Sequence, residues 1–222
     1  QYNMAYFTGP NIVTDGLVFA VDAGSTRSYP GSGTTTTSLV GSSTGTLSNG
    51  VAYVSGNGGS WDFDGVDDYI DTTFTLPAGN RSMDFWVYYN TLSSSGGGGY
   101  SLMGVQQSGG SYLYTGITSN GVGYSYAGNT GGSYSYTFSA ATWYHIACVM
   151  DSGTTRHYVN GAQEATKTYT SSVASTTEVM IGAINQQHEI DGLVPLTRIY
   201  NKALTASEVL QNFNAQKSRF GL

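Results

Sequence analysis

The chain has 222 residues, of which only 10% are charged, and its formal net charge is −6. This length suits one all-β sandwich, and no linker or shift in composition divides the chain into two units. Eight Lys and Arg on an acidic chain do not give the basic surface that phosphate backbones require, which argues against nucleic acid as a partner. The apolar runs are too short to cross a bilayer, so we expect no membrane span.

Residues 1–15 are expected to form an N-terminal arm. The arm is polar, carries Tyr2, Tyr6 and Phe7, and has no core pattern of its own, so we expect a partner to order it. Residues 16–222 are expected to form one jelly-roll domain, beginning with a strand at 16–22. Two short strands flank Ser48, Asn49 and Gly50, a sequence that predicts a hairpin-like turn.

The segment SWDFDGVDDYID, residues 60–71, combines aromatic core candidates with clustered carboxylates. Trp61 and Phe63 are expected in the core. The five Asp residues provide oxygen ligands that suit a hard cation. Asp is also a common turn former, and solvated acids tolerate one another, so a turn without metal is the alternative. The five are Asp62, Asp64, Asp67, Asp68 and Asp71.

Residues 81–90 alternate between two faces, as a strand does. The first set, expected in the core, is Met83, Phe85, Val87 and Tyr89. The second set mixes aromatic and polar side chains, which suits a sugar-binding groove as well as ordinary sheet packing. Its members are Asp84, Trp86, Tyr88 and Asn90.

Between residues 94 and 137, Tyr recurs at alternate positions in three segments: Tyr112/Tyr114, Tyr124/Tyr126 and Tyr134/Tyr136. These rows suit a stacking platform for polysaccharide. We favour an inward orientation, because the alternating Gly and Ser could not fill a core. The residues that remain candidates for carbohydrate binding are Trp86, Tyr88, Asn90, Tyr124 and Tyr126.

The stretch from residue 142 to 168 predicts a three-stranded meander. An apolar strand at 143–150, with Cys148 buried in it, is followed by strands at 154–159 and 162–168. Asn160 and Gly161 favour a type I′ turn between the last two. Pro195 predicts an edge or bulge in the strand at 193–200. Thr205 and Glu208 form a capping box for a helix at 206–214.

Four motifs resemble, in their order and spacing, the laminin G-like branch of the concanavalin A-like lectin and glucanase superfamily. They are WDFDGVDDYI, TWYHIACVMD, HYVNG and RIYNKALTASEV. The resemblance covers residues 16–214 and implies an antiparallel jelly-roll sandwich of two sheets, with one short C-terminal helix. It adds Asp22 and Asp191 to Asp64 and Asp67 as candidate calcium ligands. Residues 36–41 and Pro195 replace oxygen ligands that relatives carry, which weakens the expectation of a calcium site of the family type. Calcium is the only cofactor that the sequence suggests.

The two ends, IVTDGLVFAVDAGSTRSYPGSGT and NKALTASEVLQNFNAQKSRFGL, resemble laminin G-like proteins of tailed marine bacteriophages. This resemblance implies a place on the virion surface, as a head decoration or fibre component. The implied partners are other virion or surface subunits, in a homo-oligomer or a larger assembly, and polysaccharide. The alternative is a carbohydrate-binding module that is extracellular or on a cell surface.

No residues are identified as catalytic. Glucanases of this superfamily carry a Glu-x-Asp-x-x-Glu pattern, whereas the Glu residues here stand at 164, 178, 189 and 208. The three His residues have no triad spacing with Cys148 or any Ser. We therefore expect a non-enzymatic protein, and a glycoside hydrolase is the alternative that the missing carboxylates disfavour.

Overall fold

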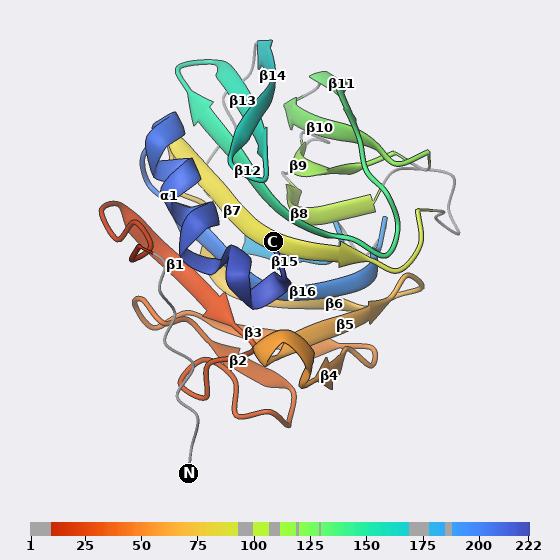
Figure 1. Cartoon of the computed structure of the whole chain (residues 1–222). Helices are drawn as coiled ribbons and strands as arrows, with labels where there is room; N and C mark the ends of the chain where they lie inside the picture. Colours follow the sequence, from red (N-terminus) through yellow and green to blue (C-terminus); the bar gives the residue numbers. More distant parts are fainter. Residues whose placement is uncertain are drawn as a thin grey trace.

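The computed structural model describes residues 10–92, 100–106, 112–118, 120–128, 130–168, 178–184 and 188–222. Two antiparallel sheets pack face to face and enclose one large apolar core (Figure 1). The expected all-β jelly roll with one short C-terminal helix is confirmed. No helix in these ranges is both long and apolar enough to span a bilayer.

The first sheet has the strand order β14-β13-β12-β7-β16-β5-β4, and β1 also pairs with β16. Its strands are β1 (Leu17–Asp22), β4 (Ala52–Val54), β5 (Ser60–Asp64), β7 (Arg81–Tyr89), β12 (Trp143–Asp151), β13 (Thr154–Val159), β14 (Ala162–Thr168) and β16 (Asp191–Tyr200).

The second sheet has the order β11-β10-β9-β8-β15-β6-β3-β2. Its strands are β2 (Thr35–Thr37), β3 (Thr44–Ser48), β6 (Tyr69–Thr75), β8 (Tyr100–Gln106), β9 (Tyr112–Ile117), β10 (Val122–Gly128), β11 (Thr130–Thr137) and β15 (Glu178–Ile181).

The predicted meander is confirmed as β12, β13 and β14. Asn160 has φ 50° and Gly161 has φ 82°, the two positive values that a type I′ turn requires. The core face of β7 is also as expected, because Met83, Phe85 and Val87 are buried between the sheets.

The turn at Asn49 and Gly50 does not close a hairpin, so that prediction is wrong. β3 pairs with β2 and β6, whereas β4 pairs with β5 in the opposite sheet. The positive φ values of Asn49 and Gly50 instead carry the chain from one sheet to the other. This crossing brings the turn to the rim of the sandwich.

The predicted bulge at Pro195 is confirmed. The register between β16 and β7 shifts between Leu193 and Leu196. On its other side β16 pairs with β5 before Pro195 and with β1 after it. The residue without a backbone N–H thus lies where β16 changes partners.

A helix, α1 (Ala206–Gln216), and the 3-10 turn η2 (Lys217–Phe220) cover the outer face of the first sheet (Figure 1). A second 3-10 turn, η1, spans Gly56–Gly58. The capping box of Thr205 and Glu208 is present, and α1 continues two residues beyond the predicted end.

A buried polar network joins α1 to the sheet beneath it. Asp84 on β7 is fully buried and accepts hydrogen bonds from Arg198 at 2.6 and 3.0 Å and from the Asn212 amide at 2.8 Å. The His145 ring lies 3.1 Å from the same carboxylate. Asn212 also accepts from the N–H of Val13, which is buried. The last part of the N-terminal arm is therefore held by this chain itself, contrary to our expectation, and residues 1–9 lie outside the described ranges.

The third tyrosine row faces inward, as favoured. The ring of Tyr134 stacks on His157 of the opposite sheet, with centroids 4.5 Å apart. An added Cβ on Gly123 would lie 2.3 Å from the Tyr134 ring. Gly123 and Ser125 of β10 are buried, beside the Tyr134 ring of β11 and the His157 ring of the opposite sheet. Because side chains alternate along a strand, Tyr124 lies on the other face, so the inward prediction is wrong for this second row.

Candidate functional site

One pocket at the rim of the sandwich gathers polar side chains from four strand ends. We call it the rim pocket; its volume is about 380 Å³. It is lined by Asn49, Gly50, Ala52, Asp62, Phe63, Asp64, Asp68, Asn90 and Asp191. Asp62 and Asp64 lie on β5, Asp191 begins β16, and Asn90 follows β7. The crossing turn between β3 and β4 closes one side.

Strand register brings these residues together. Asp191 pairs with Asp64 across β16 and β5, and Leu193 pairs with Asp62. After Asp64 the chain turns at Gly65, which has φ +74°. A Cβ there would lie 2.8 Å from the Cβ of Asp191, so glycine permits both the turn and the close approach.

Asn90 bridges two of the carboxylates. Its side-chain amide donates to Asp191 at 3.0 Å, and it also hydrogen-bonds Asp62. The Thr91 hydroxyl donates to the second oxygen of Asp191 at 2.8 Å. Asp62 and Asp191 are thereby held in fixed orientations at the mouth of the pocket.

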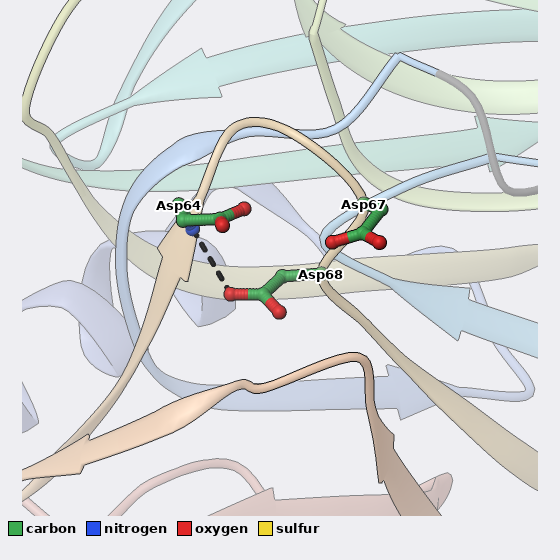
Figure 2. Close-up of side chains that lie close together, drawn as sticks. All are labelled: Asp64, Asp67 and Asp68. Carbon is green, nitrogen blue, oxygen red and sulfur yellow. Dashed lines mark hydrogen bonds between the residues drawn. The ribbon is translucent and has the colours of Figure 1, made fainter.

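Asp64, Asp67 and Asp68 form a tighter group beside them, with one carboxylate oxygen of each within 4.8 Å of the others. Figure 2 shows the carboxylates of Asp64 and Asp67 pointing toward one another above Asp68. The Asp64 N–H donates to Asp68 Oδ2 at 3.1 Å, and the Val66 N–H donates to Asp64 Oδ1 at 2.9 Å.

Burial and mutual repulsion raise the pKa values of two carboxyl groups that line the rim pocket. Burial, reinforced by Asp64, Asp67 and Asp62, raises the pKa of Asp68 to about 6, although the hydrogen bond from the Asp64 N–H opposes the shift. Burial, with smaller contributions from Asp191 and Asp64, also raises the pKa of Asp62. The pocket can therefore accept hydrogen bonds from hydroxyl groups or attract a cation.

Three of the four predicted metal ligands lie in this corner, and the fourth does not. Asp64 and Asp67 belong to the tight group, and Asp191 lines the pocket. Asp22 instead accepts hydrogen bonds from Arg219 Nη1, at 3.0 Å to each carboxylate oxygen, and from the Gly24 N–H at 2.8 Å. The Asp22 prediction is wrong, because an arginine far along the chain already occupies its carboxylate.

The predicted stacking role of Trp86 is also wrong. Trp86 has no exposed surface, because Phe220 of η2 lies 4.2 Å from it and Phe213 of α1 lies 5.8 Å away. Tyr88 is half-buried against Trp143 on the same covered face. Alternation placed both residues on the correct side of β7, but that side lies beneath the C-terminal segment.

The other carbohydrate candidates are spread over the molecule. Asn90 lines the rim pocket, and Tyr124 is half-buried on β10 in the second sheet. The side chain of Tyr126 lies outside the described part of the structure. Sequence reasoning missed that Asn49, Gly50 and Asp62 line the same pocket as Asn90, since only strand pairing shows it.

A sequence model of the laminin G-like family, described as the concanavalin A-like lectin/glucanases superfamily, matches residues 63–210. A search of curated proteins found no significant match.

Three solved structures illustrate the structural similarity. Domain 4 of AbnA, an extracellular arabinanase from Geobacillus stearothermophilus in complex with arabinotriose, has a TM-score of 0.69 at 17% identity, over 89% of this chain and 98% of that one. Trypanosoma rangeli sialidase in complex with sialic acid has a TM-score of 0.71 at 16% identity, over 95% of this chain but only 35% of the sialidase. The receptor-binding domain of botulinum neurotoxin type G has a TM-score of 0.70 at 15% identity, over 91% of this chain and 52% of that one.

These similarities show the fold, and none of the three is a virion protein, so the resemblance to bacteriophage proteins stays a prediction. The family match spans more than half of the sequence and includes the Asp-rich turn, the meander and the start of α1. The chain therefore belongs to the concanavalin A-like lectin/glucanases superfamily, as a laminin G-like domain.

Proposed function

We propose that this domain binds carbohydrate without cleaving it, and that the rim pocket holds the sugar. The observation that carries the proposal is the convergence of Asp62, Asn90 and Asp191 at one open pocket. Sugar hydroxyls donate to carboxylates, and a fixed set of polar groups selects their orientation. The arabinanase domain, which the chain matches over nearly its whole length, was solved with a bound oligosaccharide.

The charge of the pocket favours a neutral saccharide. Its lining contains four carboxylates and no Lys or Arg, on a chain whose net charge is −6. An anionic sugar would be repelled at short range. The expected ligand class is therefore a neutral oligosaccharide or polysaccharide rich in free hydroxyl groups.

The burial of one carboxylate supports a binding role over hydrolysis. Asp68, whose pKa is raised, is only 3% exposed, so its carboxyl cannot reach a glycosidic oxygen as placed.

The proposed context is the surface of a virion, or otherwise the extracellular surface. Support comes from the resemblance of the chain ends and from how the arm joins the fold. Gln211 of α1 donates to the Asn11 carbonyl at 2.8 Å, so the arm runs along α1. In Figure 1, α1 lies on the left, whereas β5 and β7 end on the right. Attachment through the arm would leave the rim pocket open to a glycan.

A glycan array followed by titration calorimetry tests the binding proposal. A neutral oligosaccharide, with arabinotriose as the first probe, should bind the parent chain, and Asn90→Ala should weaken binding at least tenfold. Asn80→Ala is the matched control, because Asn80 is exposed at the opposite end of β7 and bonds Asp151. An array without binding, or an Asn90→Ala variant that binds as well as the parent, contradicts the proposal.

Two further measurements test the non-enzymatic role and the virion context. New reducing ends released from a polysaccharide, at a rate that Asp68→Asn abolishes, would overturn the non-enzymatic role. Mass spectrometry of purified particles should detect the chain, and its absence from them would contradict the virion context.

A further inference from the structure

We propose that the domain has a second saccharide site, a pocket on the outer face of the first sheet that takes one neutral sugar ring. We call it the helix-side pocket; its volume is about 350 Å³, and it reaches the first residue of α1. Its lining includes Asp151, Arg156, Tyr158, Gln163, Ala203 and Leu204, none of which lines the rim pocket. The inference therefore concerns a separate surface and goes beyond the function proposed above.

Strand register builds the polar wall of this pocket. Arg156 and Tyr158 are two residues apart on β13, so their side chains share one face of the sheet. Tyr158 pairs with Gln163 on β14, and its hydroxyl donates to Gln163 Oε1 at 3.1 Å. Gln163 Nε2 donates to the Thr166 hydroxyl at 3.2 Å. An amide nitrogen carries two hydrogens, so the second can donate to a ligand.

The buried side of the helix-side pocket is apolar. Tyr158 is 2% exposed, and its ring belongs to the same buried cluster as Leu204 and Val209. Ser82 on β7 fixes the segment that carries Leu204. Its hydroxyl accepts from the Leu204 N–H at 2.9 Å and donates to the Lys202 carbonyl at 2.9 Å. Because the apolar side is held in place by the sheet, a ligand would bind without the cost of ordering it.

An ion pair lies on the exposed side. Arg156 Nη1 is 3.3 Å from Asp151 Oδ2, and the two side chains are 35% and 37% exposed. A pair this exposed contributes little to stability and is accessible to a ligand. The guanidinium has five N–H donors, of which the contact with Asp151 uses one, and a carboxylate offers several acceptor positions. Arg156 can therefore donate to one sugar hydroxyl while Asp151 accepts from its neighbour.

The charges of the pocket indicate the class of ligand. Its lining contains one cation, Arg156, and one anion, Asp151, so its formal charge is zero. Asp151 would repel an anionic ligand, and Arg156 would repel a cationic one. An apolar ligand would desolvate both groups without replacing their hydrogen bonds with water. A neutral sugar ring avoids all three costs, because its hydroxyls bind the ion pair and its C–H groups contact the apolar side.

The helix-side pocket and the rim pocket lie at opposite ends of β7. Asp151 lies beside the start of β7, since Met150 pairs with Arg81, whereas Asn90 follows the end of the strand. β7 has nine residues, and at about 3.3 Å for each residue the two pockets are roughly 30 Å apart. One domain should therefore hold two segments of a polysaccharide, and the second contact would strengthen attachment by raising the effective concentration.

NMR titration with neutral monosaccharides tests the site directly. The probes are D-glucose, D-galactose and L-arabinose. At least one of them should shift the Nε–H signal of Arg156 and the side-chain amide signal of Gln163. We expect a Kd on the order of 1–10 mM, as for a ligand of about a dozen heavy atoms. Arg156→Lys should weaken the binding at least fivefold, read at Gln163, because an ammonium group keeps the charge but lacks the planar fork of donors.

Arg27→Lys is the matched control, since Arg27 is exposed in the loop after β1 and lines neither pocket. It should leave the binding unchanged. Absence of shifts at Gln163 with all three sugars, or equal Kd values for Arg156→Lys and the parent, would overturn the inference. Sodium glucuronate that binds as tightly as glucose would overturn the assignment of a neutral ligand. The shifts are read far from the rim pocket, so no result depends on whether a glycan binds there.

Discussion

Phe220 lies on the face of Trp86, with ring centroids 4.2 Å apart and planes inclined by 26°. Phe220 also approaches Trp143 at 4.6 Å. This aromatic stack anchors η2 to the outer face of the first sheet. It occupies the surface on which a sugar ring would otherwise stack.

The first prediction concerns this stack. Phe220→Ala should lower the free energy of unfolding by about 3 kcal/mol, because a buried aromatic side chain is removed and a cavity remains. Acrylamide quenching of tryptophan fluorescence should increase, since Trp86 becomes accessible. Leu222→Ala is the control, because Leu222 is 47% exposed, and it should change stability by less than about 0.5 kcal/mol.

The second prediction concerns the buried ion pair of Asp84 and Arg198. Asp84→Asn should cost about 3–5 kcal/mol in urea unfolding at pH 7, because it leaves the Arg198 charge buried without its partner. The control is Asp151→Asn, which removes a pair with Arg156 that is about one-third exposed. That change should cost less than about 1 kcal/mol. Equal losses for the two variants would contradict the assignment.

Acid sensitivity should follow from the same carboxylate. Burial alone would raise the pKa of Asp84, but Arg198, His145 and Asn212 hold it well below its usual value. The unfolded chain therefore takes up the proton first, so the contribution of Asp84 to stability is complete above about pH 4 and is lost as the pH falls further. Urea midpoints of the parent and Asp84→Asn should converge in that acid range.

The third prediction concerns His157 in the core. Burial, with a smaller contribution from Lys167, lowers the pKa of His157 to about 4. Between about pH 6.5 and 4 the unfolded chain binds a proton that the folded one does not, so stability should fall with pH by about 3 kcal/mol. His157→Gln should remove this slope, measured as the difference from the parent. A slope unchanged by the substitution would show that His157 is accessible to protons in the folded state.

Local chemistry made much of the fold predictable. The Asn160 and Gly161 turn, the Thr205 cap and the bulge at Pro195 each follow from the conformational limits of a few neighbouring residues. Cys148 was expected to be buried, as it is, and burial raises the pKa of its thiol to about 12. Alternation along β7 identified its core face.

Contacts between distant segments were not predictable in the same way. Trp86 is covered by Phe220 and Asp22 is paired with Arg219, and no sequence period links either pair. The sequence at Asn49 and Gly50 predicted a hairpin, because a hairpin turn and this crossing both need residues that tolerate positive φ values. The rim pocket depends on register between β5 and β16, so the sequence indicated acidic ligands without showing which of them converge.

The guanidinium of Arg219 reaches Asp22 on the first strand and the carbonyls of Asn57 and Gly59 near η1. Arg219 is synthesised after every strand of the sandwich. During translation, β1 therefore lacks the hydrogen bonds that Arg219 donates to Asp22. β1 and β16 likewise meet only late in synthesis. Contacts between residues far apart in the sequence slow folding. During translation, strands of this domain should therefore have unpaired edges, which a chaperone would have to cover.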